Sequence, residues 1–294
     1  MSETRTQACK ICATPATLVG VRKGTFKAQL FEIFTCDNCG FTFVNNPWLA
    51  YNEIYSEAYY DGKGADPFVD YVFELQNPTK TVRQYEWRGI AEAIRSCLPL
   101  EASIRWLDFG CGNGGLVRHC REHLGCSIWG YEEGWIRDQA LKLGIPLMTS
   151  DALDSARGTF DVVTAIEVLE HLADPLNELR RIRSLLKPGG LVFITTGNAA
   201  PHRGRLFSWG YFLPELHISL FEPRTLARAL EESGFRAEFR GHSPGFDNII
   251  RFKVLKTLGF RTTSLMERAL PWKLLSRIVD QKSRVTAHPI GWAE

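Results

Sequence analysis

A glycine-rich stretch at residues 105–117, RWLDFGCGNGGLV, constrains this chain more than any other part of it. A short apolar run reaches Asp108 and then breaks into the closely spaced Gly110, Gly112 and Gly114. Because glycine lacks a Cβ atom, such a loop can adopt positive φ and lay its backbone against a ligand. The stretch therefore predicts a strand, a tight loop and a helix start around a nucleotide-like molecule. Glycine spacing alone does not choose among the enzymes that use such loops.

The segments that follow place acidic residues after short strands. The apolar run at 127–131 ends in Glu132, at the distance expected of a carboxylate that binds ribose hydroxyls, and Glu133 is the rival position. A third segment, residues 145–151, brings Asp151 and then Ala152 to the end of another short strand.

The later segments complete an alternating pattern of strands and helices. Residues 160–167 predict a strand that ends at Ile166 and Glu167, residues 177–186 a helix, and residues 191–196 a further strand. This order predicts an α/β fold with a doubly wound, Rossmann-like, seven-stranded and mostly parallel sheet.

Five motifs in this order resemble the class I S-adenosylmethionine-dependent methyltransferases: LDFGCGNG at 107–114, GYE at 130–132, FDVV at 160–163, EVLEHL at 167–172 and LKPGG at 186–190. The resemblance covers roughly half of the chain, from Trp106 to about Phe239. It implies that S-adenosylmethionine is the methyl donor.

The resemblance also implies roles for particular residues. Asp108 and the loop of Gly110, Gly112 and Gly114 would surround the methionine portion of the donor. The remaining donor contacts would be Glu132 on the ribose, Asp151 with Ala152 near the adenine, and Ile166 or Glu167 beside the sulfonium.

Charge and hydropathy limit the partners and the cellular location that we expect for this chain. The chain has 35 lysines and arginines against 33 aspartates and glutamates. Its net charge is therefore too small to indicate a nucleic-acid partner. It shows no signal-peptide core and no apolar run long enough to span a bilayer. We therefore expect a cytoplasmic enzyme without a membrane partner, and the sequence does not indicate its oligomeric state.

Four of the eight cysteines form two CxxC pairs, Cys9 with Cys12 and Cys36 with Cys39. This spacing is typical of a zinc ribbon, in which four thiolates meet around one ion. A closed four-sulfur site leaves no position for substrate, so the predicted zinc is structural. The alternative is a pair of disulfides, which a reducing compartment disfavours.

The chain divides into four predicted parts: a zinc-ribbon module at 1–45, a tyrosine-rich linker or lid at 46–78, a methyltransferase domain at 79–240 and a basic C-terminal helical extension at 241–294. In the linker, Tyr55, Tyr59 and Tyr60 either form a lid over the ligands or pack the ribbon against the main domain. Helices are expected at 68–75 and 79–98.

Basic residues of the extension, among them Lys253, Lys256 and Arg284, lie on predicted amphipathic helices. They are either solvated faces or contacts to an anionic substrate.

A hydroxyl or carbon-acid acceptor requires a group that takes its proton, and histidine suits that work near neutrality. His217 is the first candidate and His171 the second, although each has a structural alternative. Glu215 and Tyr211 are close enough in sequence to orient His217 or to bind substrate.

These features together resemble methyltransferases that act on small polar metabolites, including nucleotide-linked or phosphorylated sugars. A base methyltransferase for rRNA or tRNA is the alternative, although residues 25–46 are not rich in the lysine and arginine that bind phosphates. A non-catalytic module that binds the donor is the third hypothesis.

Overall fold

A central sheet runs through the computed structural model, which describes residues 5–64, 70–99, 103–240, 244–283 and 288–293. The described strands of this sheet follow the order β10-β11-β8-β7-β5-β6. Their bounds are β5 (Arg105–Phe109), β6 (Ser127–Tyr131), β7 (Phe160–Ile166), β8 (Leu186–Thr195), β10 (Phe235–Arg240) and β11 (His288–Ala293). Strands β5 to β8 pair in parallel, whereas β11 is antiparallel to both neighbours. The α/β class and the doubly wound parallel sheet are thus confirmed.

The predicted strand at 145–151 is reduced to one parallel bridge between Leu147 and Gly130. Pro146 has no N–H to donate, and the chain turns at Ser150 into α7 (Ser150–Asp154). The described sheet therefore has six strands and this bridge at its edge, where seven strands were expected.

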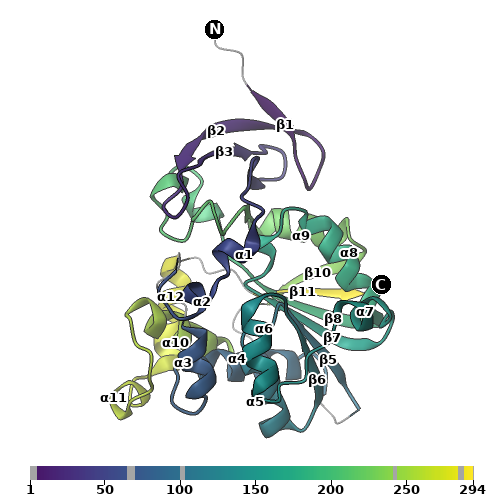
Figure 1. The fold of residues 1–294 in the computed structure, drawn as a ribbon, viewed down its shortest axis with the longest axis vertical. Helices are drawn as coiled ribbons and strands as arrows, with labels where there is room; N and C mark the ends of the chain where they lie inside the picture. The colour runs from purple at the N-terminus through teal and green to yellow at the C-terminus, as the bar shows by residue number, and fades with distance from the viewer. Residues whose placement is uncertain (1–4, 65–69, 100–102, 241–243, 284–287, 294) are drawn as a thin grey trace.

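Two apolar cores cover the two faces of the sheet, because alternate strand residues point to opposite sides. One core joins Leu107, Val163 and Val192 to α8 (Pro175–Leu185) and α9 (Pro223–Glu231). The other joins Trp106, Val162 and Phe193 to α4 (Arg83–Arg95), α5 (Gly115–Leu124), α6 (Trp135–Lys142) and α10 (Phe246–Thr257). Helices thus lie on both faces, which leaves the ends of the strands accessible to ligands (Figure 1).

The C-terminal segment differs from the helical extension expected over 241–294. It contains α10, α11 (Leu265–Arg268) and α12 (Trp272–Ser283), but β11 then returns to the sheet between β8 and β10. The three helices are therefore an insertion before the last strand. Arg284, counted in the basic segment, lies outside the described residues.

The N-terminal module forms a second sheet from β1 (Thr6–Ala8), β2 (Pro15–Lys23), β3 (Leu30–Thr35) and β4 (Thr42–Val44). Its fifth strand, β9 (Ser219–Leu220), comes from the other half of the chain and pairs with β4. The ribbon and the catalytic half therefore share a sheet, at the upper end of the view in Figure 1.

The linker forms α1 (Tyr51–Ile54), α2 (Glu57–Tyr60) and α3 (Tyr71–Gln76). Tyr59 and Tyr60 are buried in a cluster with Ile136 and Leu216, so they pack the linker against the catalytic half. The helix expected from residue 68 begins at Tyr71 in the described part of the chain, and Phe68 itself lies outside it. The helix expected at 79–98 is α4. Among the described residues, none of the helices has both the length and the apolar character that a membrane crossing requires.

Candidate active site

The glycine loop connects β5 to α5, as the sequence predicts. Gly110, Gly112 and Gly114 have φ of 71°, 55° and 71°, a region that side chains with a Cβ atom rarely adopt. A Cβ atom on Gly110 would also lie 2.6 Å from Val168 Cγ2. The loop backbone is therefore free to contact a ligand only because these positions are glycine.

Asp108 is the second-last residue of β5, two positions before Gly110, and is buried. Thr164 donates its hydroxyl to Asp108 Oδ1 at 2.6 Å, while burial raises the pKa of the carboxyl to about 7. Asp108 lines a cavity of about 480 Å³ together with Gly110, Gly112, Ile166 and Glu167. Five of the predicted donor-binding residues therefore surround one space.

Glu132 lies at the tip of β6 and reaches back to the loop. Its Oε2 accepts the Gly112 N–H at 2.6 Å and its Oε1 accepts the Glu133 N–H at 2.9 Å. Burial raises the pKa of Glu132 to about 7. Glu133 instead accepts a hydrogen bond from the Tyr131 hydroxyl. The geometry thus favours Glu132 over its rival as the ribose acceptor.

Asp151 and Ala152 lie in the first turn of α7, where both side chains are exposed. The Thr149 hydroxyl caps this helix by accepting the Ala152 N–H at 3.2 Å. In the described part of the chain, neither residue hydrogen-bonds the glycine loop. Their contact with adenine therefore stays a prediction.

Three groups converge beyond the end of β7. Glu167 has φ of 54°, unusual for a residue with a side chain, and its carboxylate accepts from Lys253 Nζ at 3.0 Å. Burial alone would raise the pKa of Glu167, but the Lys253 ammonium outweighs it and lowers that pKa to about 2. The Tyr211 hydroxyl lies 3.2 Å from Glu167 Oε2 and 2.7 Å from Glu170 Oε1.

Glu170 is the second carboxyl of this cluster. Burial and the nearby Glu167 carboxylate raise the pKa of Glu170 to about 8. The Thr196 hydroxyl donates to its other oxygen at 2.8 Å. One charged and one largely protonated carboxyl therefore meet at the Tyr211 hydroxyl.

The two candidate histidines are neighbours, with ring centroids 4.9 Å apart. His217 Nδ1 donates to the Tyr211 carbonyl oxygen, so its Nε2 keeps the lone pair. His171 Nδ1 lies 2.8 Å from the Tyr55 hydroxyl and 3.0 Å from the Leu216 carbonyl oxygen. Burial and His171 lower the pKa of His217 to about 3, which keeps it neutral at physiological pH.

The side-chain atoms of Glu170, His171 and His217 that could bind a metal ion all lie within 4.8 Å of one another. Groups this close can pass a proton or hold a cation. The structure thus brings together His171, Tyr211 and His217 from the predicted catalytic set.

Glu215 is the exception in that set. Its Oε1 accepts the N–H groups of Phe26 at 2.8 Å and Lys27 at 3.4 Å, both in the ribbon. Among the described residues, Glu215 makes no hydrogen bond to His217. Of the two roles considered for Glu215, orienting His217 through a hydrogen bond is thus not seen in the described residues, and binding substrate stays a prediction.

Lys253 was placed only in a basic segment by the sequence, yet it binds Glu167 and lies 3.7 Å from Glu86 Oε1. Lys253 and Glu167 are 86 positions apart in the sequence, so no local motif predicts their contact. One helical turn later, Lys256 lines a second cavity, of about 620 Å³, between α3, α4 and α10.

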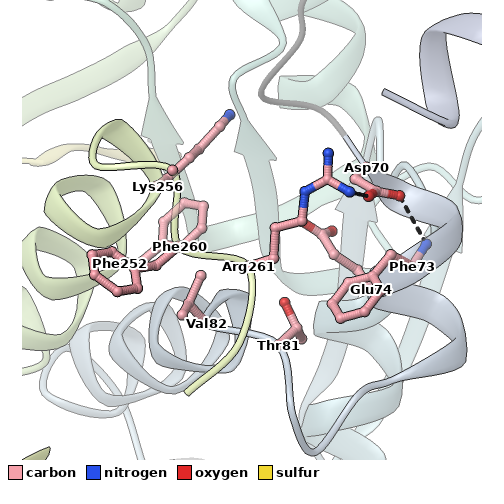
Figure 2. Close-up of a pocket in the computed structure, with 10 residues that line it drawn as sticks. Asp70, Phe73, Glu74, Thr81, Val82, Phe252, Lys256, Phe260 and Arg261 are labelled. Atoms are coloured by element: carbon pink, nitrogen blue, oxygen red, sulfur yellow. Dashed lines mark hydrogen bonds and ion pairs between the residues drawn. The ribbon is translucent and has the colours of Figure 1, made fainter. Parts of the chain in front are cut away.

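Figure 2 shows the walls of this second cavity: Phe252 and Phe260 lie on one side, and Asp70, Phe73 and Glu74 on the other. Arg261 donates to Asp70 at 2.6 Å. Glu74 lines both cavities, so the aromatic space lies next to the glycine loop.

The four ribbon cysteines gather as predicted. Their sulfur atoms all lie within 4.8 Å of one another, with Cys9 3.6 Å from Cys39 and Cys12 3.4 Å from Cys36. These separations exceed a disulfide bond, and all four thiols are free. Four sulfurs in one small cluster fit a tetrahedral zinc ion.

Comparison with known proteins gives one family match and several partial ones. The family described as "Methyltransferase domain" matches residues 81–238, more than half of the chain. A protein named "Ubiquinone biosynthesis O-methyltransferase" from Parvibaculum lavamentivorans is 35% identical over 133 residues, 42% of this chain and 52% of that protein. Its namesake from Ruegeria pomeroyi is 42% identical over 109 residues, 34% of this chain and 44% of that protein. The chain thus spans about half the length of the curated relatives it matches.

Among solved structures, a complex of the Haloferax volcanii Trm112 methyltransferase activator with a methyltransferase aligns with a TM-score of 0.49. The identity is 15%, and the alignment covers 76% of this chain and 97% of that one.

Proposed function

The chain belongs to the family of methyltransferase domains, and on that premise we propose that it transfers a methyl group from S-adenosylmethionine to a small-molecule acceptor. The observation that carries the proposal is that Glu167 lines the pocket of the glycine loop and Asp108 and also contacts the Tyr211 hydroxyl. The Tyr211 ring stacks on His217, with ring centroids 4.0 Å apart. Methyl transfer depends mainly on holding the methyl donor and the acceptor in line and shielding them from water.

On the donor side, S-adenosylmethionine supplies an electrophilic methyl group on its sulfonium. The glycine loop and Asp108 bind its methionine portion, and Ile166 and Glu167 border the sulfonium. Glu132 uses its remaining lone pairs for the ribose hydroxyls, since Gly112 and Glu133 occupy only part of its accepting capacity. Asp151 and Ala152 border the adenine.

On the acceptor side, His217 takes the acceptor proton at Nε2. Its Nδ1–H bond to the Tyr211 carbonyl fixes the tautomer that leaves this nitrogen free. Burial lowers the pKa of His217 to about 3, so the imidazole is neutral and can accept a proton, but it is a weaker base than one with a pKa near the working pH. It therefore requires an acceptor more acidic than an ordinary alcohol, such as a phenol or an enol. His171 is the rival base.

The substrate is proposed at two levels. The name of the curated relatives supports oxygen methylation of a small molecule. The nucleotide-linked or phosphorylated sugar suggested by the sequence is a narrower proposal, and the relatives give it no support.

Zinc held by Cys9, Cys12, Cys36 and Cys39 is proposed as a structural ion that stabilises the ribbon. Reduced thiols at this site agree with the proposed cytoplasmic location.

The test combines binding and transfer. We expect calorimetry to show one S-adenosylhomocysteine site per chain, and labelled methyl groups to move from the donor to phenols or enols. The same assay includes sugar nucleotides and bulk ribosomal RNA as acceptors. Transfer only to RNA would favour the base-methyltransferase alternative, and binding without any transfer would favour the non-catalytic module.

A further inference from the structure

Glu215 connects the catalytic half of the chain to the ribbon. The residue is 2% exposed, and its Oε1 accepts two backbone N–H groups, from Phe26 and Lys27, at the turn between β2 and β3. A Cβ atom on Gly24 would lie 2.4 Å from the same oxygen, so the turn closes tightly around the carboxylate. Two hydrogen bonds to one side-chain oxygen, from residues 189 and 188 positions away, therefore attach this turn to the catalytic half.

The segment that follows Glu215 is bonded to the ribbon on one side and to the catalytic cluster on the other. Ile218 donates its N–H to the Glu170 carbonyl at 2.8 Å and accepts the Val44 N–H at 2.9 Å. Strand β9 then pairs with β4. His217 lies between Glu215 and these backbone bonds, so its position depends on ribbon contacts before and after it.

The pairing of β9 with β4 also connects the His217 segment to the cysteine cluster. Strand β4 begins three residues after Cys39 and pairs along one edge with β9 of the catalytic half. The Thr225 hydroxyl donates to the Cys39 carbonyl at 2.5 Å, and Arg224 donates to the Asp37 carbonyl at 3.5 Å. The cysteine cluster, β4 and β9 are therefore successive parts of one bonded unit.

Among the described residues, the polar groups of the donor side make no hydrogen bond to the ribbon, although ribbon residues such as Phe34 and Cys39 share an apolar cluster with Phe109. Asp108 is bonded to Thr164 on the neighbouring strand, and Glu132 to the backbone of Gly112 and Glu133. These contacts lie within the catalytic sheet and its loops.

We propose that Glu215 is a positioning residue through which the zinc ribbon holds His217 in place, so that the ribbon and its metal govern the acceptor side of the site and not the donor side. The inference rests on the proposed function in taking His217 as the proton acceptor.

The experiment uses the full zinc-loaded chain and three variants. Glu215→Ala removes the acceptor of both amides, whereas Glu215→Gln keeps a side-chain oxygen that can accept them. Glu53→Ala is the matched control, because Glu53 pairs with Lys27 at the same turn without touching Glu215. Nitrogen-15 NMR of the imidazole rings reports the His217 tautomer, with His217→Gln used for assignment, and calorimetry reports S-adenosylhomocysteine affinity.

We expect one tautomer, protonated at Nδ1, in the wild type, in Glu53→Ala and in Glu215→Gln, and a mixture of tautomers in Glu215→Ala. The S-adenosylhomocysteine affinity should stay within about twofold in all of them, because distant sites act nearly independently. Removing the zinc from the wild type with a chelator should reproduce the Glu215→Ala spectrum.

An unchanged His217 spectrum in Glu215→Ala would overturn the inference while leaving the proposed function intact. If Glu215→Ala does not fold, the test uses the wild type from which a chelator has removed the zinc. An unchanged His217 spectrum in that sample would also overturn the inference. Failure of the wild type to bind S-adenosylhomocysteine would instead count against the proposed function.

Discussion

The donor and acceptor sides of the candidate site are assembled in different ways. Asp108, the glycine loop, Glu132 and Ile166 all follow the ends of neighbouring parallel strands within about 60 residues of sequence. The acceptor side joins His171 after β7, Tyr211 and His217 from a long irregular segment, Tyr55 from the linker and Lys253 from the inserted helices. The predicted donor contacts therefore come from one sheet, although Tyr71 and Glu74 of the linker also line the donor pocket. The acceptor side depends entirely on how separate modules pack.

This contrast suggests that the two sides can be damaged separately. A change on the sheet should alter donor affinity, and a change at a module boundary should alter turnover at constant donor affinity. The four predictions below test that separation, from the largest expected effect to the smallest.

The largest effect is expected from loss of the zinc. Cys36→Ser removes one of four thiolates, and because metal binding stabilises such ribbons by roughly 10 kcal/mol or more in apparent free energy, the N-terminal module should unfold before the sheet does. Elemental analysis and hydrogen exchange measure both parts. Cys97→Ser, outside the cluster, is the control. Equal protection of residues 5–45 in the two variants would contradict a structural metal.

The next effect concerns turnover alone. His217→Ala should lose roughly a hundredfold or more in kcat, the usual scale for a general base, while S-adenosylhomocysteine affinity stays unchanged. Methyl-transfer kinetics and calorimetry separate the two quantities. If His171→Ala is inactive and His217→Ala is normal, His171 is the base. Normal turnover in both would mean that positioning alone carries the reaction.

The affinity for the methyl donor should fall when a residue at a strand tip of the catalytic sheet is changed. Glu132→Ala removes a buried carboxylate from the ribose site and should weaken S-adenosylhomocysteine binding by roughly 1–3 kcal/mol. Glu133→Ala is the control, since its carboxylate contacts the Tyr131 hydroxyl instead. A larger loss in the control would move the ribose role to Glu133.

The last prediction concerns stability at acid pH, an effect that leaves donor affinity and turnover at neutral pH unchanged. The pKa of His217 is about 3 in the folded chain and near 6.5 when it is unfolded, so the unfolded state takes up the proton first as the pH falls. His217 therefore contributes stability above about pH 6.5 that is lost towards pH 3.

The His217→Gln variant should accordingly show a shallower fall in Tm between pH 6.5 and pH 4, by about 2–4 °C for each kcal/mol of difference. Calorimetric scans at several pH values measure it, with His123→Gln, an exposed histidine, as the control. Parallel curves for wild type and His217→Gln would show that burial does not depress this pKa.

The sequence predicted those parts of the fold in which local pattern and tertiary structure agree. The glycines with positive φ, the strand tips at Asp108 and Glu132 and the two cysteine pairs each depend on a few adjacent residues. The edge strand at 145–151 failed because Pro146 and the early helix cap at Thr149 limit its pairing. The strand β11 was missed because nothing near it distinguishes a continued helical extension from a return to the sheet.

The sequence by itself determined the features that depend on neighbouring residues. These are a glycine loop for a nucleotide-like molecule, acidic strand tips, a four-sulfur cluster and an alternating α/β order. Only the tertiary structure decided which charges meet, since Lys253 reaches Glu167 across 86 positions and Glu215 reaches Phe26 across 189. The physical reason is that loop conformation and metal-ligand spacing are set by neighbouring residues. Ion pairs and strand pairing between modules instead depend on surfaces that exist only once the chain has folded.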